Sequence, residues 1–118
     1  MTHLKLNTQQ RSAILDLAEQ MRLPFLNSRK ADRKLAILWA LVEQDGEFSS
    51  HSMAKKASNF IQRSSISSSV TGHFLGMMFR KGLVNIERIV SDVALYKQSE
   101  EFNNKVKQWR DKYENIEE

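Results

Sequence analysis

The chain has 118 residues, of which 41% are hydrophobic and 27% charged, with a formal net charge of +4. This size suits one globular domain, residues 1–118, with a single core, and it leaves no room for a second domain of ordinary size. Cysteine is absent, which excludes disulfides, thiolate nucleophiles and cysteine-based zinc sites.

The positive charge is concentrated in the middle of the chain. Residues 49–99 hold seven Lys and Arg against two acidic residues, a net charge of +5, whereas residues 1–48 carry +1 and residues 100–118 carry −2. A field of this kind attracts polyanions such as nucleic acids. The alternative interpretation is a solvated basic surface without a partner. No apolar run approaches the roughly 18 to 20 residues of a membrane helix, so we expect a cytoplasmic protein with no membrane partner.

The first helix is predicted over residues 8–22. Asn7 and Gln10 have the spacing of a capping box. Behind them, one helical face is apolar: Ile14, Leu17, Ala18 and Met21. Pro24 cannot continue this helix, so a linker is expected at residues 23–27, with Phe25 and Leu26 as buried anchors.

The second helix is predicted over residues 28–44 and is apolar on most of its sides, which is typical of a central helix. The apolar positions are Ala31, Leu35, Ile37, Leu38, Trp39, Leu41 and Val42. Asp45-Gly46 follows, a pair that tolerates the left-handed turn that ends a helix.

Two shorter helices are expected next. One begins at Ser49 or Ser50 and buries Met53, Ala57, Phe60 and Ile61, with Ser52, Lys55 and Lys56 pointing away. A tight turn at residues 62–65 leads into the other, residues 66–81, which ends at Gly82. Its inward stripe is Ile66, Val70, Phe74, Met77 and Met78.

An extended pattern replaces the helical one after Gly82. Residues 83–90 and 93–98 are rich in Val and Ile around a turn at Ser91-Asp92, which predicts a β-hairpin. Ser99 then caps a last helix over residues 99–117.

The last helix carries a heptad seam, with apolar residues in steps of four and three: Phe102, Val106, Trp109, Tyr113 and Ile116. We expect this seam to form a homodimer together with the face of the first helix that holds Ile14, Leu17 and Met21. The alternative is that the stripe packs on its own domain. A dimer of this kind places two DNA-reading helices roughly 34 Å apart.

The order of these elements, with the segment Leu75-Gly-Met-Met-Phe-Arg-Lys-Gly-Leu-Val84 at its centre, resembles the winged helix-turn-helix of bacterial transcription regulators of the MarR and PadR types. The resemblance covers residues 31–99. It implies a mainly α (α+β) winged helix-turn-helix whose helix 66–81 enters the major groove of double-stranded DNA. The acidic hairpin tip, which lacks Arg and Gly, departs from the family pattern.

Candidate DNA contacts are of two kinds. The outward side of helix 66–81 and its approach offer hydroxyls, a small residue and an imidazole: Ser65, Ser67, Ser68, Ser69, Thr71, Gly72 and His73. Phosphate-neutralising cations are expected before this helix and on the hairpin: Lys55, Lys56, Arg63, Arg88 and Lys97. We expect both sets to form one continuous electropositive strip with weak sequence reading, because no Arg, Asn or Gln faces the bases.

Nothing in the sequence indicates chemistry. His3, His51 and His73 lack metal-ligand spacing, and neither a nucleophile elbow nor a phosphate-binding glycine loop occurs. We therefore expect a nucleoid-associated repressor or a plasmid or phage accessory factor, with no enzyme activity, cofactor or metal. The alternatives are a non-specific architectural DNA binder and a protein-interaction module. The latter would use the terminal helices with Leu75 and Phe79, which lie outside the inward stripe and belong either to a wider core or to an interface.

Overall fold

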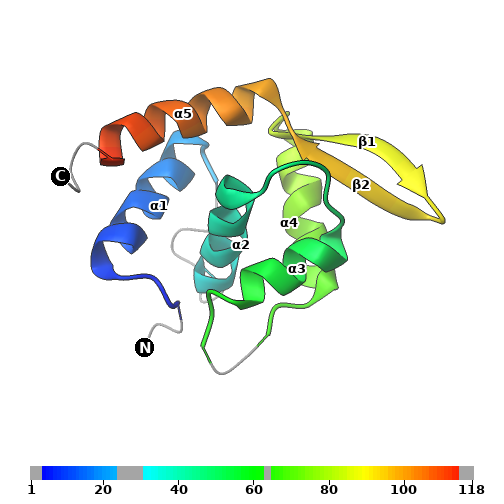
Figure 1. Ribbon diagram of the computed structural model, residues 1–118, viewed down its shortest axis with the longest axis horizontal. Coiled ribbons are helices and arrows are strands. Elements are labelled where there is room, and N and C mark those ends of the chain that lie inside the picture. Colours follow the sequence, from blue (N-terminus) through cyan, green and yellow to red (C-terminus); the bar gives the residue numbers. More distant parts are fainter. Residues whose placement is uncertain (1–3, 24–30, 63–64, 115–118) are drawn as a thin grey trace.

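The computed structural model describes residues 4–23, 31–62 and 65–114, and this part consists of five helices and a two-stranded antiparallel sheet. In chain order the elements are α1 Thr8–Gln20, α2 Ala31–Glu43, α3 Ser50–Ser58, α4 Ser68–Arg80, β1 Val84–Val90, β2 Val93–Gln98 and α5 Glu100–Glu114 (Figure 1). The expectation of a mainly helical chain with one small hairpin is confirmed. The predicted linker anchors Phe25 and Leu26 lie outside the described residues.

Four of the helices begin at a polar side chain that accepts a hydrogen bond from a backbone N–H of the first turn. Asn7 and Gln10 form the predicted capping box of α1, with N···O distances of 2.7 and 3.1 Å. Serines perform the same role for three other helices: Ser49 for α3, Ser67 for α4 and Ser99 for α5. Such caps each stabilise a helix by about 1 kcal/mol and fix where it starts.

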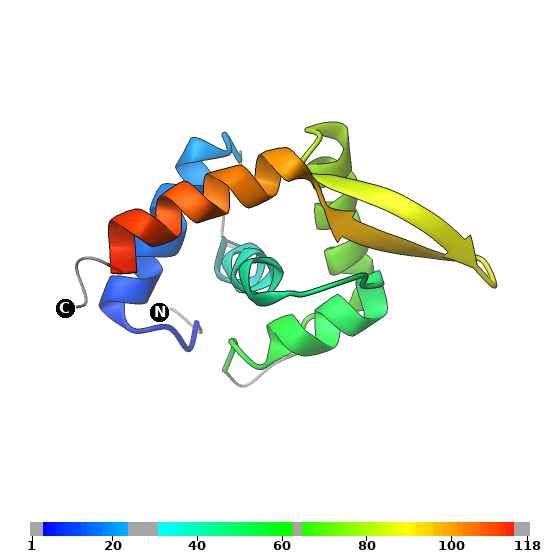
Figure 2. The ribbon, with the colours of Figure 1, turned by 45° about the horizontal axis from the view of Figure 1, so that its top comes forward.

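The helix α2 is the centre of the molecule, and Figure 2 shows it enclosed by the other helices. This confirms the central place that its apolar sequence predicts. Six residues between positions 35 and 41 are fully buried: Leu35, Ala36, Ile37, Leu38, Ala40 and Leu41. The helices α1, α3 and α4 all pack against it. Because most of its surface is buried, α2 is the element against which the other helices are positioned.

Side chains from two later elements satisfy the last carbonyls of α2. Gln98, at the end of β2, donates through Nε2 to the carbonyls of Leu41 and Gln44, both at 2.9 Å. Arg110 of α5 donates to the carbonyl of Val42, also at 2.9 Å. A helix leaves its final carbonyls without intrahelical partners, and here these bonds fasten both the hairpin base and α5 to α2.

The helix α5 lies across α1 (Figure 2). The two helices bury their apolar stripes within one chain. The Trp109 indole also donates to the carbonyl of Ala13 at 2.6 Å. The side chains predicted for the dimer seam are buried or, in the case of Tyr113, half-buried: Ile14, Leu17, Met21, Phe102, Val106, Trp109 and Tyr113. Ile116 lies outside the described residues. The predicted seam between subunits is therefore wrong for these described residues, because they form the core of a single chain.

The connection between α3 and α4 is longer than predicted. The helix α3 ends at Ser58 and α4 begins at Ser68, so the expectation of one tight turn at residues 62–65 is wrong. Phe60 and Ile61, expected inside α3, lie beyond it, and Ile61 forms an isolated bridge with Leu4. The hydroxyl of Ser58 accepts from the backbone N–H of Ile66 at 2.9 Å, which fastens the connection to the end of α3.

The hairpin projects away from the helices (Figure 1). Its two strands pair from Val84–Gln98 to Val90–Val93, with a β-bulge between Ile86 and Arg88. Ser91 and Asp92 adopt φ of 49° and 66°, the left-handed turn residues that a two-residue hairpin connection requires. At the base, the backbones of Phe48 and Tyr96 exchange hydrogen bonds of 3.0 and 2.7 Å, and their rings stack.

Leu75 and Phe79, whose place the sequence leaves open, have opposite environments. Leu75 is fully buried, whereas Phe79 is 47% exposed. Leu75→Ala should therefore lower the free energy of unfolding by about 2–5 kcal/mol, while Phe79→Ala should change it by less than about 1 kcal/mol. Urea denaturation of both variants checks this, and equal losses would contradict the assignment.

The bonds that Gln98 makes to the end of α2 predict a second stability effect. Gln98→Ala removes both donors and should cost about 1–2 kcal/mol of unfolding free energy. Gln108→Ala, on the exposed side of α5, is the matched control and should stay within about 0.5 kcal/mol of the parent chain. Thermal and urea unfolding measure both; a neutral Gln98→Ala would mean that these carbonyls do not depend on this side chain.

Candidate nucleic-acid interface

A shallow groove of about 320 Å³ runs along α4 on its solvent side. The residues that line it lie on one face of the helix, and most of them have small side chains. They are Ser69, Gly72, His73, Gly76 and Arg80. Two glycines and a serine on one helix face leave the backbone within reach of an incoming surface. The groove is thus a place where another molecule can approach the helix itself.

The beginning of α3 lies against the first half of α4. The Nδ1 atom of His51 is 3.3 Å from the hydroxyl of Ser68. A Cβ added to Gly72 would lie 4.0 Å from the Cβ of Ser50, an ordinary van der Waals contact. These contacts extend the groove side of α4 onto α3. His51 is exposed and was not among the predicted contacts, since its role depends on the packing of two helices.

The predicted hydroxyl residues divide into exposed and buried ones. Five of the residues in this group are exposed: Ser65, Ser67, Ser68, Ser69 and His73. Gly72 is half-buried. Thr71 is fully buried, and its hydroxyl donates to the carbonyl of Ser67 at 3.0 Å. The expectation that Thr71 contacts a partner is therefore corrected, because its side chain faces the core.

The predicted cations also differ in what they are free to bind. Lys55 and Lys97 are exposed. Lys56 is half-buried and donates to Oε1 of Gln44 at 3.3 Å. Arg88 forms an ion pair of 3.0 Å with Glu47. Arg63 lies outside the described residues.

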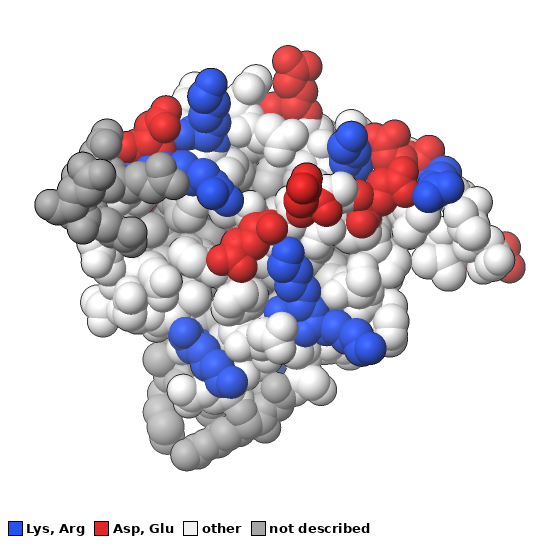
Figure 3. Space-filling view, viewed as in Figure 1, with Lys and Arg blue, Asp and Glu red and all other residues white. Residues whose placement is uncertain are grey.

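Acidic side chains interrupt the positive surface. Figure 3 shows basic and acidic side chains interspersed on one face of the molecule, including around the hairpin. Glu47 pairs with Arg88, and Asp92 stands in the turn at the hairpin tip. On this face the positive surface is therefore interrupted, and Glu47 offsets the charge of Arg88, one of the cations expected in the strip.

Arg80 completes the groove at the end of α4 and is a further candidate contact beside the predicted ones. One of its guanidinium nitrogens lies 3.7 Å from the position of a Cβ on Gly76, so the side chain folds back along the helix. Within the described part of the chain it forms neither an ion pair nor a hydrogen bond. The helical spacing from Ser69 through Gly72 and Gly76 to Arg80 is the signal that could have found it.

The outer part of the hairpin is apolar rather than basic. Four of its side chains are more than 40% exposed: Ile86, Ile89, Val90 and Val93. Exposed apolar groups that lie together are typical of surfaces that contact proteins or membranes. The hairpin tip thus offers little that would neutralise a phosphate.

No protein-family model matches the chain, and no curated protein matches its sequence. Residues 4–23, 31–62 and 65–114 contain no group of three or more metal-ligating side chains. None of the helices described in these ranges is long and apolar enough to cross a lipid bilayer.

Proposed function

We propose that α2, α3, α4 and the hairpin form a winged helix-turn-helix and that the protein binds double-stranded DNA through the groove side of α4, as a regulator or an accessory DNA-binding factor. The observation that carries this proposal is the groove of small and hydrogen-bonding side chains along α4. The order of the elements also supports it, since a helix pair followed by a hairpin is the arrangement of this fold.

The chemistry of the groove side fits a nucleic acid better than an apolar ligand. Serine hydroxyls donate to phosphates and to the edges of either kind of base pair. Lys55 and Arg80 supply charges for phosphates. Because no Asn or Gln lines the groove and Arg80 lies at its end, base discrimination should be weak, which leaves room for a non-specific architectural role.

The hairpin contributes less to this proposal than the family resemblance implies. Arg88 is paired with Glu47, and the tip carries Asp92 between apolar strands. The connection of residues 59–67 is also longer than the three- or four-residue turn of a simple helix-turn-helix. The proposal consequently depends on α3 and α4, and it concerns one chain on DNA, since the predicted seam is buried in the core.

A second candidate function is protein interaction through the hairpin. Ile89 is 68% exposed, and Val90 and Val93 beside it extend this apolar surface. Such a surface offers no charge or hydrogen-bond donor to a phosphate and is typical of protein contacts. Such a module would not require Lys55 or Arg80. The salt dependence of DNA binding therefore separates the two candidates.

Titration of a fluorescent DNA duplex at several salt concentrations tests the DNA proposal. Each phosphate contact contributes about −0.9 to the slope of log K against log salt. The double variant Lys55→Ala/Arg80→Ala should bind more weakly and should lose about 2 from the magnitude of this slope. Lys107→Ala, an exposed lysine on α5, is the matched control and should keep the parent slope.

Three outcomes would count against the proposal: no duplex binding, binding that salt does not weaken, or equal effects of the double variant and of Lys107→Ala. The first two favour the protein-interaction module. Comparison of random and genomic duplexes in the same assay separates a sequence-reading regulator from an architectural binder.

A further inference from the structure

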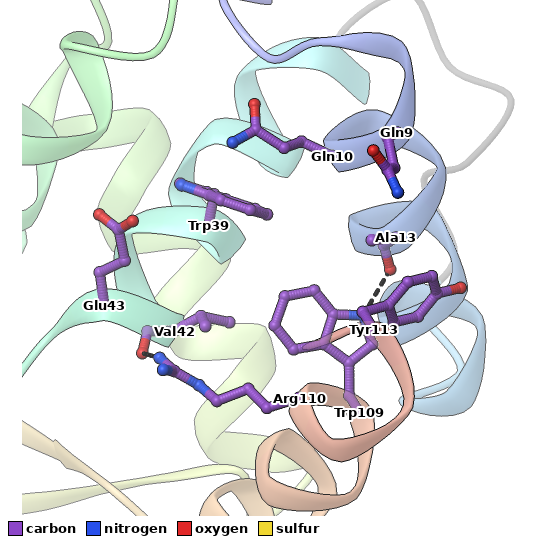
Figure 4. Close-up of a pocket in the computed structure, with 9 residues that line it drawn as sticks. All are labelled: Gln9, Gln10, Ala13, Trp39, Val42, Glu43, Trp109, Arg110 and Tyr113. Atoms are coloured by element: carbon purple, nitrogen blue, oxygen red, sulfur yellow. Dashed lines mark hydrogen bonds between the residues drawn. The ribbon is translucent and has the colours of Figure 1, made fainter. Parts of the chain in front are cut away.

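A pocket of about 260 Å³ lies between α1, α2 and α5, away from the groove side of α4. Figure 4 shows that side chains of all three helices converge on it. Aromatic, aliphatic and polar side chains line it together: Gln9, Gln10, Ala13, Trp39, Val42, Glu43, Trp109, Arg110 and Tyr113. An apolar, concave site with a few convergent polar groups is the usual form of a small-molecule site.

The aromatic side chains are held in a fixed corner. The rings of Trp39 and Trp109 meet edge to face, with centroids 6.0 Å apart, and Tyr113 lies 5.8 Å from Trp109. Trp109 is only 6% exposed, and its indole donates a hydrogen bond to the carbonyl of Ala13, so this ring is held in place. Trp39 is only half-buried, so the corner offers indole surface to a flat ring at little cost in side-chain entropy.

Two polar groups at the pocket have no partner within the described residues. The indole N–H of Trp39 donates no hydrogen bond there, and the exposed carboxylate of Glu43 accepts none and forms no ion pair. Figure 4 places both on the same side of the pocket. Arg110, by contrast, is engaged with the carbonyl of Val42. Arg110 keeps its positive charge in that bond, so Glu43 is the charged group of the lining that has no partner among the described residues.

Tyr113 adds a neutral polar group to the opposite wall. Burial, followed by the negative charge of Asp16 and a hydrogen bond to it, raises the pKa of Tyr113 above its ordinary value of 10.0. The phenol therefore remains protonated at neutral pH and does not compete with Glu43 for a cation.

We infer that this pocket binds a small aromatic cation, a flat ring that carries an ammonium group. The ring packs into the corner of Trp39 and Trp109, and the cation lies between the Glu43 carboxylate and the electron-rich indole faces. The volume fits a ligand of one or two rings. This site lies apart from the proposed DNA surface and shares no lining residue with it.

The chain contains two tryptophans, and both line the pocket, so their fluorescence reports directly on it. The probes are benzylamine, benzyl alcohol and phenylacetate, which share a ring and differ in charge, with excitation at a wavelength that tryptophan alone absorbs. Benzylamine should give a saturable change with a Kd about 2- to 5-fold below that of benzyl alcohol, and phenylacetate should bind most weakly.

Variants assign the effect to the pocket. Glu43→Gln should abolish the preference for the amine over the alcohol while it leaves alcohol binding unchanged, and Glu87→Gln, an exposed carboxylate of the hairpin, should change neither. Trp39→Phe, with Trp109 as the remaining reporter, should weaken all three probes. The inference is overturned if no probe gives a saturable change, if phenylacetate binds as well as benzylamine, or if Glu43→Gln behaves like Glu87→Gln.

Discussion

Burial of α2 and side-chain bonds to its C-terminal end hold the other elements in place. Because α2 is apolar over most of its surface, it requires neighbours on most of its sides. Its last carbonyls accept side-chain bonds from Gln98 and Arg110. One short stretch of backbone therefore holds both the hairpin base and α5. The side chain of Gln44, at the same end of α2, also accepts a hydrogen bond from Lys56 of α3. Side-chain caps of partly buried carbonyls stabilise a structure because water cannot fully replace them.

This arrangement divides the surface into two regions with different chemistry. On one side, α1 and α5 close over α2 and leave an aromatic pocket at their common edge (Figure 4). On the other, α3 supports α4 so that the groove side of α4 stays open. The two regions share α2, since Glu43 borders the pocket and the next residue, Gln44, binds Lys56. The proposed ligand pocket and the proposed nucleic-acid surface thus share no lining residue.

Much of the fold could be predicted from local patterns, because caps and helical periodicity act within a few residues. The capping box at Asn7, the central place of α2 and the turn at Ser91-Asp92 are examples. Long-range choices could not be predicted in this way. A heptad stripe fits a partner chain and a neighbouring helix equally well, and the Trp109 bond to Ala13 is visible only in three dimensions. The pairing of Arg88 with Glu47 and the burial of Thr71 are of the same kind.

We propose that the open side of α3 and α4 is the surface that meets DNA. Amide chemical shifts of the ¹⁵N-labelled chain, recorded with and without a short duplex, test it most directly. Perturbations should concentrate in residues 50–58 and 65–80, while the shifts of α1 and of the distal half of β1 should stay near their free values. Perturbations confined to the hairpin or to α1 and α5, or no perturbation at all, would contradict it.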